Sequence, residues 1–113
     1  MAEVSQHLDL GALKELQAVM GDEFSLLIDT FTRDSILRIE AIREAVSASD
    51  AEAIRRAAHS FKGSAGNMAA PLLTDLCGSL EELGHSGETA GSEQLQQNII
   101  EEYAFVKSAL ESL

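Results

Sequence analysis

The chain has 113 residues, of which 45% are hydrophobic and 24% are charged, a composition typical of one ordinary folded domain. Its 19 acidic and 8 basic side chains give a formal net charge of -11 at pH 7, which disfavours nucleic acid and anionic membranes as partners because like charges repel. The single cysteine excludes an internal disulfide, and no apolar run approaches the roughly 20 residues that span a bilayer.

Apolar residues recur at three- and four-residue steps, which predicts helices rather than strands. We expect the first helix over residues 10–19, between a capping Asp9 and a terminating Gly21. A second, longer helix is expected over residues 23–47, opened by Asp22. Both segments carry an apolar stripe, so both are expected to pack against a common core.

The third helix is expected to begin at Ser49, because Glu52 follows it at the spacing of a capping box, and to continue to about Ala69. Pro71 suits the first turn of a fourth helix, which is expected to stop at Gly84. These two helices contain the most informative residues of the chain.

Residues 85–91 are polar and glycine-rich, which predicts a loop, and Ser92 is expected to cap a last helix whose apolar stripe ends at Leu113. The pattern predicts an all-α protein, namely an antiparallel four-helix bundle with an additional short N-terminal helix across one end or side. We expect one domain over residues 1–113, flexible over residues 1–8. We also expect a monomer in the cytoplasm, since no signal peptide is visible.

His59 stands apart from the apolar stripe of the third helix. At about 100° per residue the stripe points in one direction and His59 points roughly 140° away, toward solvent. Gly63 and Gly66 share the His59 face, although each glycine inside a helix costs about 1 kcal/mol relative to alanine. This face points away from the core, so packing does not require a small residue there. The two glycines therefore predict that a large partner surface comes close to the imidazole. The stripe consists of Ile54, Ala58, Phe61, Ala65 and Met68.

Three of the 8 basic residues lie close to His59 in sequence: Arg55, Arg56 and Lys62. In a protein of net charge -11 they form a local cationic cluster. Such a cluster favours a phosphoryl group or an acidic pocket on a partner.

The segment His59-Ser60-Phe61-Lys62-Gly63-Ser64 resembles the signature of histidine-containing phosphotransfer (HPt) domains of multistep phosphorelays. The family pattern is a histidine, two residues, a Lys-Gly pair, and a serine or small residue on an exposed bundle helix. The likeness continues through Asn67-Met68 and Leu76-Cys77 to Leu80-Glu81-Glu82-Leu83. Ala65 and Ala69 depart from the pattern, since the family often has Ser and Gly there. The short length resembles stand-alone bacterial HPt proteins.

The resemblance implies that Nε2 of His59 accepts a phosphoryl group from a receiver-domain aspartate of a hybrid sensor kinase. The phosphohistidine then passes the group to the aspartate of a response regulator. The protein is accordingly expected to be a phosphotransfer protein rather than an enzyme, with no cofactor and no metal site of its own. Receiver domains supply the Mg²⁺ and the catalysis.

The resemblance also implies roles for the residues around His59. Lys62 is expected to bond a phosphoryl oxygen, and Gly63 to leave room for that group and for the partner. Ser60 and Ser64 are expected hydrogen-bond partners. Three residues near the end of the fourth helix are candidates to reach His59, but the sequence does not fix the rotation of that helix and so leaves open which of them, if any, makes the contact: Glu81, Glu82 and His85.

An exposed apolar surface is also expected, because a receiver needs one for docking. The candidates lie on the first helix and at the start of the second, with two arginines of the cationic cluster: Leu13, Leu16, Met20, Phe24, Leu27, Arg55 and Arg56. The alternative function is a helical adaptor that binds signalling partners without chemistry. Substitution of His59 separates the two, since an adaptor is indifferent to it.

Overall fold

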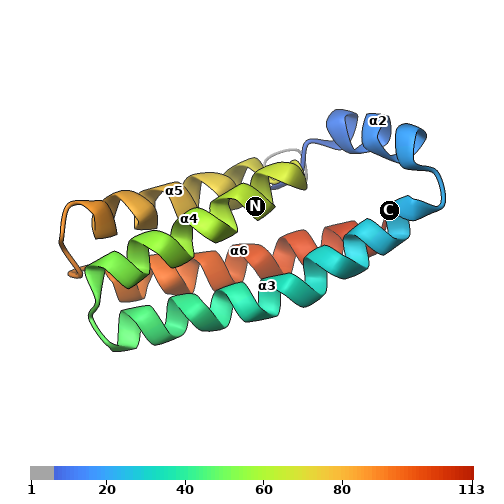
Figure 1. The fold of residues 1–113 in the computed structure, drawn as a ribbon. Helices are drawn as coiled ribbons and strands as arrows, with labels where there is room; N and C mark the ends of the chain where they lie inside the picture. The colour runs from blue at the N-terminus through green and yellow to red at the C-terminus, as the bar shows by residue number, and fades with distance from the viewer. Residues whose placement is uncertain (1–6) are drawn as a thin grey trace.

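The structure is a computed structural model that describes residues 7–113, and within this range it contains helices α2 to α6 and no strand. The bounds are α2 Leu10–Met20, α3 Glu23–Ser47, α4 Ala51–Asn67, α5 Pro71–His85 and α6 Ser92–Glu111. Successive long helices run in opposite directions, with α4 and α5 side by side above α3 and α6 (Figure 1). The short α2 lies beyond one end of this bundle (Figure 1). The expected all-α antiparallel four-helix bundle with an additional short N-terminal helix is confirmed.

Two predicted helix caps are wrong. The α4 cap is Asp50, whose side chain accepts a hydrogen bond from the Ala53 N–H at 3.1 Å. Ser49 instead lies in the turn that follows α3, in the left-handed region, with a φ of 51°. Helix α6 is preceded by Gly91 in a left-handed conformation, which places Ser92 inside the helix, where it is buried. In both places the chain has to reverse before the next helix can begin.

Helix α4 ends in a Schellman motif centred on Ala69. The Ala70 N–H donates to the Ala65 carbonyl, and the Ala69 N–H donates to the Gly66 carbonyl, both at 3.1 Å. Ala69 therefore adopts a φ of 54°, in the region that glycine prefers. This short reversal brings α5 back along α4.

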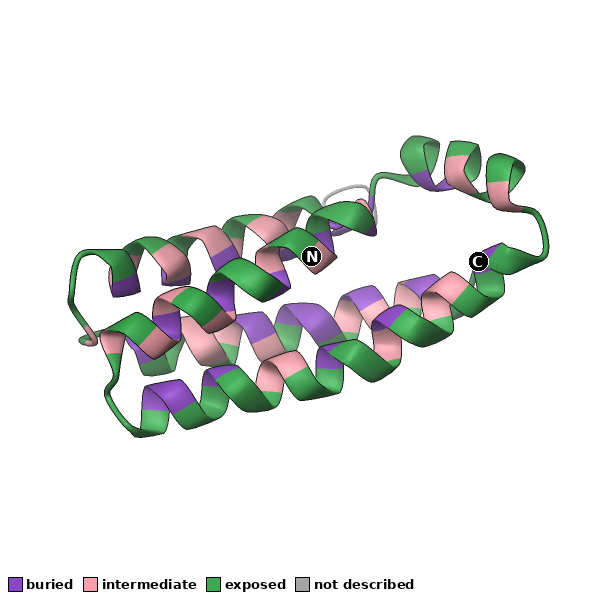
Figure 2. Cartoon of the chain, in the orientation of Figure 1, coloured by how far each residue is buried: buried purple, intermediate pink, exposed green. Residues whose placement is uncertain are grey.

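The core lies between the four long helices, where the buried residues of each helix face inward (Figure 2). The predicted stripe of α4 is confirmed, because all five of its residues are buried. Gly84 is also buried, and it does not end α5, which continues to His85. A Cβ at Gly84 would lie 2.6 Å from the Ala51 carbonyl oxygen and 2.7 Å from the backbone nitrogen of Arg55. The backbones of α4 and α5 therefore touch at this end of the bundle.

The segment before α2 is anchored to the bundle. The His7 Nδ1 lies 2.5 Å from the Glu102 Oε2, and the His7 ring stacks on Phe105 with ring centres 3.8 Å apart. Leu8 is fully buried. The expected flexibility of residues 1–8 is therefore wrong for His7, to which α6 gives an aromatic and a charged partner, and for Leu8, which is buried in the core. Residues 1–6 lie outside the described residues. No helix within residues 7–113 is long and apolar enough to cross a membrane.

Candidate functional site

His59 lies on the solvent side of α4, near the middle of the bundle. Its side chain is 65% exposed, which confirms the outward orientation expected from the helical spacing. The core residues Ala58 and Phe61 hold this turn of the helix from the opposite side, since both are fully buried. The imidazole is thus presented on a rigid support rather than on a loop.

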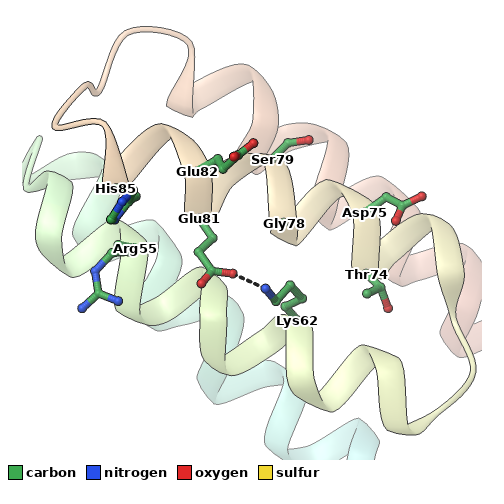
Figure 3. Close-up of a pocket in the computed structure, with 9 residues that line it drawn as sticks. All are labelled: Arg55, Lys62, Thr74, Asp75, Gly78, Ser79, Glu81, Glu82 and His85. Atoms are coloured by element: carbon green, nitrogen blue, oxygen red, sulfur yellow. Dashed lines mark ion pairs between the residues drawn. The ribbon is translucent and has the colours of Figure 1, made fainter.

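Glu81 of α5 is the residue that reaches His59. Its Oε2 lies 2.8 Å from the His59 Nδ1, and its Oε1 lies 2.5 Å from the Lys62 Nζ. Of the three candidates near the end of the fourth helix, the structure therefore selects Glu81. Within residues 7–113, no hydrogen bond or ion pair joins His59 to Glu82 or His85. Figure 3 shows the Glu81–Lys62 pair between the two helices.

The ionisation of Glu81 fixes the tautomer of His59. The bond from Lys62 lowers the pKa of the Glu81 carboxyl against the opposing effect of its partial burial, and the His59 bond lowers it further. Glu81 is therefore a carboxylate, which only accepts hydrogen bonds. We assign the proton of the His59 ring to Nδ1, where it is donated to Glu81. This leaves the lone pair on Nε2, the nitrogen that faces away from the carboxylate.

A polar groove runs along α4 and α5 beside this pair (Figure 3). The stem of Lys62 crosses α5 at Gly78, where a Cβ would lie 3.7 Å from the Lys62 Cδ. The lining residues are Arg55, Lys62, Thr74, Asp75, Gly78, Ser79, Glu81, Glu82 and His85. The lysine stem therefore lies along the surface of α5, and its ammonium is turned toward Glu81.

The predicted cationic cluster is largely compensated by carboxylates. Arg55 binds Glu52 through two nitrogens, at 2.5 Å and 3.1 Å, and Lys62 is paired with Glu81. Arg56 lies 4.0 Å from the same Glu52 carboxylate and is exposed. Arg55 and Arg56 also lie on different sides of α4, since Arg55 lines the groove toward α5 and Arg56 a depression toward α3. These arginines do not form one free positive patch, although a role in docking stays a prediction.

The two glycines of the His59 face are exposed, as expected. A Cβ at Gly63 would meet nothing within 4 Å, and one at Gly66 would meet only the Thr74 Oγ1 at 4.0 Å. The packing of this chain therefore requires glycine at neither position. Access for a partner stays the prediction that accounts for them.

The two serines of the signature have different surroundings. Ser60 is exposed, and its Oγ accepts a hydrogen bond from the Nη1 of Arg38 on α3. Ser64 is half-buried, and no side-chain hydrogen bond of Ser64 occurs within residues 7–113. Arg38 was missed by the sequence interpretation. Its only sequence signal is a basic residue beside the apolar stripe of α3, directly before Ile39.

The predicted docking surface is wrong for two residues. Leu13 and Phe24 are 2% and 4% exposed, because α2 and the first turn of α3 bury their large side chains in the core. Leu16, Met20 and Leu27 are half-buried against the core, and their part in docking stays a prediction. The large apolar side chains that α3 does expose are Leu26, Ile36 and Leu37.

Comparisons with known proteins agree with this arrangement. The family model described as "Hpt domain" matches residues 26–113. Among solved structures, the crystal structure of histidine-containing phosphotransfer protein B (HptB) from Pseudomonas aeruginosa PAO1 is similar to this chain, with 42% identity and a TM-score of 0.90. The match covers 94% of this chain and 92% of that one. No curated protein matches significantly.

These matches favour phosphotransfer over the alternative of a helical adaptor without chemistry. HPt domains in general interact with receiver domains of kinases and response regulators. They carry phosphoryl groups and are not classical enzymes. The chain belongs to the Hpt domain family, and its role is histidine phosphotransfer in phosphorelay signalling.

Proposed function

We propose that His59 is the residue that carries the phosphoryl group. It accepts the group from a receiver-domain aspartate of a hybrid sensor kinase in the cytoplasm and passes it to the aspartate of a response regulator. One observation carries this proposal: an exposed imidazole whose Nδ1 is held 2.8 Å from the Glu81 carboxylate, which leaves Nε2 free to attack. The outer face one turn further along α4 is open at Gly63.

The transfer is a single displacement at phosphorus. The Nε2 lone pair of His59 forms the N–P bond while the bond between phosphorus and the aspartyl oxygen breaks. The electron pair of the broken bond stays on the aspartyl oxygen, so the receiver aspartate becomes a free carboxylate. No proton is gained or lost, since the Nδ1 proton stays on the ring, and the ring becomes positively charged beside Glu81.

The same pair supports the return step. A positively charged ring is a good leaving group, so the second receiver aspartate displaces it and the neutral Nδ1–H tautomer is restored. Glu81 stabilises the charged ring by a charge-assisted hydrogen bond, while Lys62 holds Glu81 in place and offers its ammonium to a phosphoryl oxygen. The protein contributes position and charge, which are the main requirements of phosphoryl transfer.

The receiver contributes the remaining chemistry. We propose that its Mg²⁺ neutralises charge on the phosphoryl oxygens, so that this chain acts without a metal of its own, as a monomer. Leu16, Met20 and Leu27 are proposed to add apolar contacts to the docked receiver. Gly63 and Gly66 are proposed to let its active-site loops approach His59.

Label transfer tests the assignment of His59. Receiver domains carrying radiolabelled aspartyl phosphate are mixed with the wild-type protein, with His59→Gln and with His85→Gln. The last variant is the control, because it removes an exposed histidine that makes no hydrogen bond to His59 or Glu81 within residues 7–113. We expect wild type and His85→Gln to become labelled with an acid-labile bond, and His59→Gln to stay unlabelled with unchanged helicity. Labelling of His59→Gln at the wild-type rate would contradict the proposal.

A further inference from the structure

Arg38 links α3 to α4 at the residue that follows His59 in the sequence. Its Nη1 donates to the Oγ of Ser60, the residue that follows His59. The side chain is half-buried, and its Nε is shielded from solvent without a hydrogen-bond partner within residues 7–113. The guanidinium is therefore held across the seam between the two helices, on the side of α4 opposite to the one where Lys62 meets α5.

The charges around His59 single out Arg38. Arg55 and Lys62 each bind a carboxylate at 2.5 Å, and Arg56 lies 4.0 Å from the carboxylate that Arg55 binds, so each of these three cations has a carboxylate at ion-pair distance. Within the described range, Arg38 has no carboxylate at ion-pair distance and binds only the neutral hydroxyl of Ser60. A phosphoryl group on His59 brings up to about two negative charges next to the existing charge of Glu81.

We infer that Arg38 is an anion-binding residue of the phosphotransfer site, which receives oxygens brought to His59 from the α3 side. This inference rests on the proposed role of His59. The guanidinium suits the task because it is always charged and has N–H donors left over after the bond to Ser60. The oxygens belong either to the phosphoryl group on His59 or to the carboxylates of the receiver's acidic pocket.

The central test substitutes glutamine for Arg38. Arg38→Gln removes the charge and keeps a polar side chain with N–H donors at this position, although glutamine is shorter than arginine and does not reproduce the bond from Nη1 to the Ser60 Oγ. The matched control is Arg43→Gln, because Arg43 is an exposed arginine of the same helix and its loss changes the net charge equally. Arg38→Lys restores the charge without the planar fork. Circular dichroism verifies that each variant is folded.

Two measurements separate the sources of the anion. The first is the second-order rate of transfer from a phosphorylated receiver, which we expect to fall about tenfold in Arg38→Gln and to recover in part in Arg38→Lys. The second uses potassium phosphoramidate, a small phosphoryl donor, to label the isolated protein and follows formation and loss of the phosphohistidine. A defect in both measurements assigns the phosphoryl group as the bound anion, and a defect with the receiver alone assigns the receiver's carboxylates.

The inference is overturned if Arg38→Gln matches Arg43→Gln in both measurements. That result leaves the role of His59 intact, because the wild-type protein still accepts the phosphoryl group. Failure of the proposed function has a different signature, since the wild-type protein then takes no label from any receiver. If Arg38→Gln folds poorly, Arg38→Met replaces it, because methionine removes the charge with a long, flexible apolar side chain. A rate equal to that of Arg43→Gln in both measurements would then overturn the inference.

Discussion

The carboxylate of Glu81 connects His59 to Lys62, with Oε2 2.8 Å from the His59 Nδ1 and Oε1 2.5 Å from the Lys62 Nζ. Helix α5 thereby sets the tautomer of a side chain that α4 supplies. We expect Glu81→Ala to lower the transfer rate from a phosphorylated receiver about tenfold, because the ring is then free to place its proton on Nε2. The ¹⁵N NMR shifts of the two ring nitrogens report the tautomer directly.

Two further variants isolate the hydrogen bond. Glu81→Gln keeps an oxygen that accepts from the His59 Nδ1–H, so it should retain more activity than Glu81→Ala. Glu82→Ala removes an exposed carboxylate of the same helix and should leave the rate unchanged. A wild-type rate and a wild-type tautomer in Glu81→Ala would show that the carboxylate does not orient the ring.

The Lys62–Glu81 ion pair makes stability depend on pH. Because Lys62 lowers the pKa of Glu81 below its ordinary value of 4.5, the pair stabilises the folded protein above that value. The stabilisation is lost as the pH falls through the lowered pKa, where Glu81 takes up a proton. We expect Lys62→Met to lower the free energy of unfolding at about pH 6 to 7 and to have a smaller effect at about pH 3.

Urea denaturation at several pH values measures this difference. The matched control is Lys14→Met, which removes an exposed lysine of α2 that has no ion pair within residues 7–113. Lys14→Met should show no comparable dependence on pH. If the effect of Lys62→Met were equal across the whole range, the lost interaction would be packing of the lysine stem on Gly78 rather than the ion pair.

Ala69 occupies a backbone conformation that suits glycine, with a φ of 54°. We expect Ala69→Gly to raise the free energy of unfolding by roughly 0.5–1 kcal/mol, since the relief of the left-handed strain exceeds the added entropy of the unfolded chain. Ala104→Gly, at an exposed position inside α6, should instead lower it by about 1 kcal/mol. Thermal denaturation of both variants checks the opposite signs, and equal destabilisation would contradict the strain at Ala69.

Gly84 is required by packing, because a Cβ there would lie 2.6 Å from the Ala51 carbonyl oxygen and 2.7 Å from the Arg55 nitrogen. Both atoms are backbone, so α4 and α5 have to separate to admit a methyl group. We expect Gly84→Ala to destabilise the protein by about 1–3 kcal/mol. Chemical denaturation measures the loss, and a stability equal to wild type would show that the two helices separate at little cost.

The helices and the α4 stripe were predictable because burial imposes a period of about 3.6 residues on the sequence. Periodicity places His59 on the outer face without reference to any other helix. The contacts of Glu81 and Arg38 were harder to predict from the sequence, because they depend on the register of α5 and α3 against α4. Gly84 has the same difficulty: a glycine at a close contact and a glycine at a helix end look alike in sequence.

The ends of the helices were a second feature that the sequence could not fully predict. Ser49 and Asp50 are both good capping residues, and only the reversal of the backbone after α3 decides between them. The sequence predicts a flexible terminus at His7, because nothing near this residue in sequence indicates Glu102 or Phe105 as partners. Leu13 and Phe24 likewise belong to apolar stripes, and the sequence does not tell whether such a stripe packs in the core or is exposed for docking.

Gly63 separates the demands of stability from those of access. A Cβ there meets nothing within 4 Å, so Gly63→Ala should stabilise the protein by roughly 0.5–1 kcal/mol through helix propensity alone. Gly63→Gln should also fold, yet its side chain stands one turn from His59 on the face that the receiver approaches. We expect it to slow transfer from a receiver while phosphoramidate, which needs no docking surface, still labels His59 at the wild-type rate.

The matched control for this comparison is Ala104→Gln, which adds bulk at an exposed position of α6. It should change neither rate. If Gly63→Gln accepted phosphate from receivers as fast as wild type, the glycine would not serve access. If it lost labelling by phosphoramidate as well, the side chain would be acting on His59 itself rather than on the docking of a partner. A more stable fold in Gly63→Ala together with slower transfer in Gly63→Gln would show that this turn of α4 gives up stability in order to admit another protein.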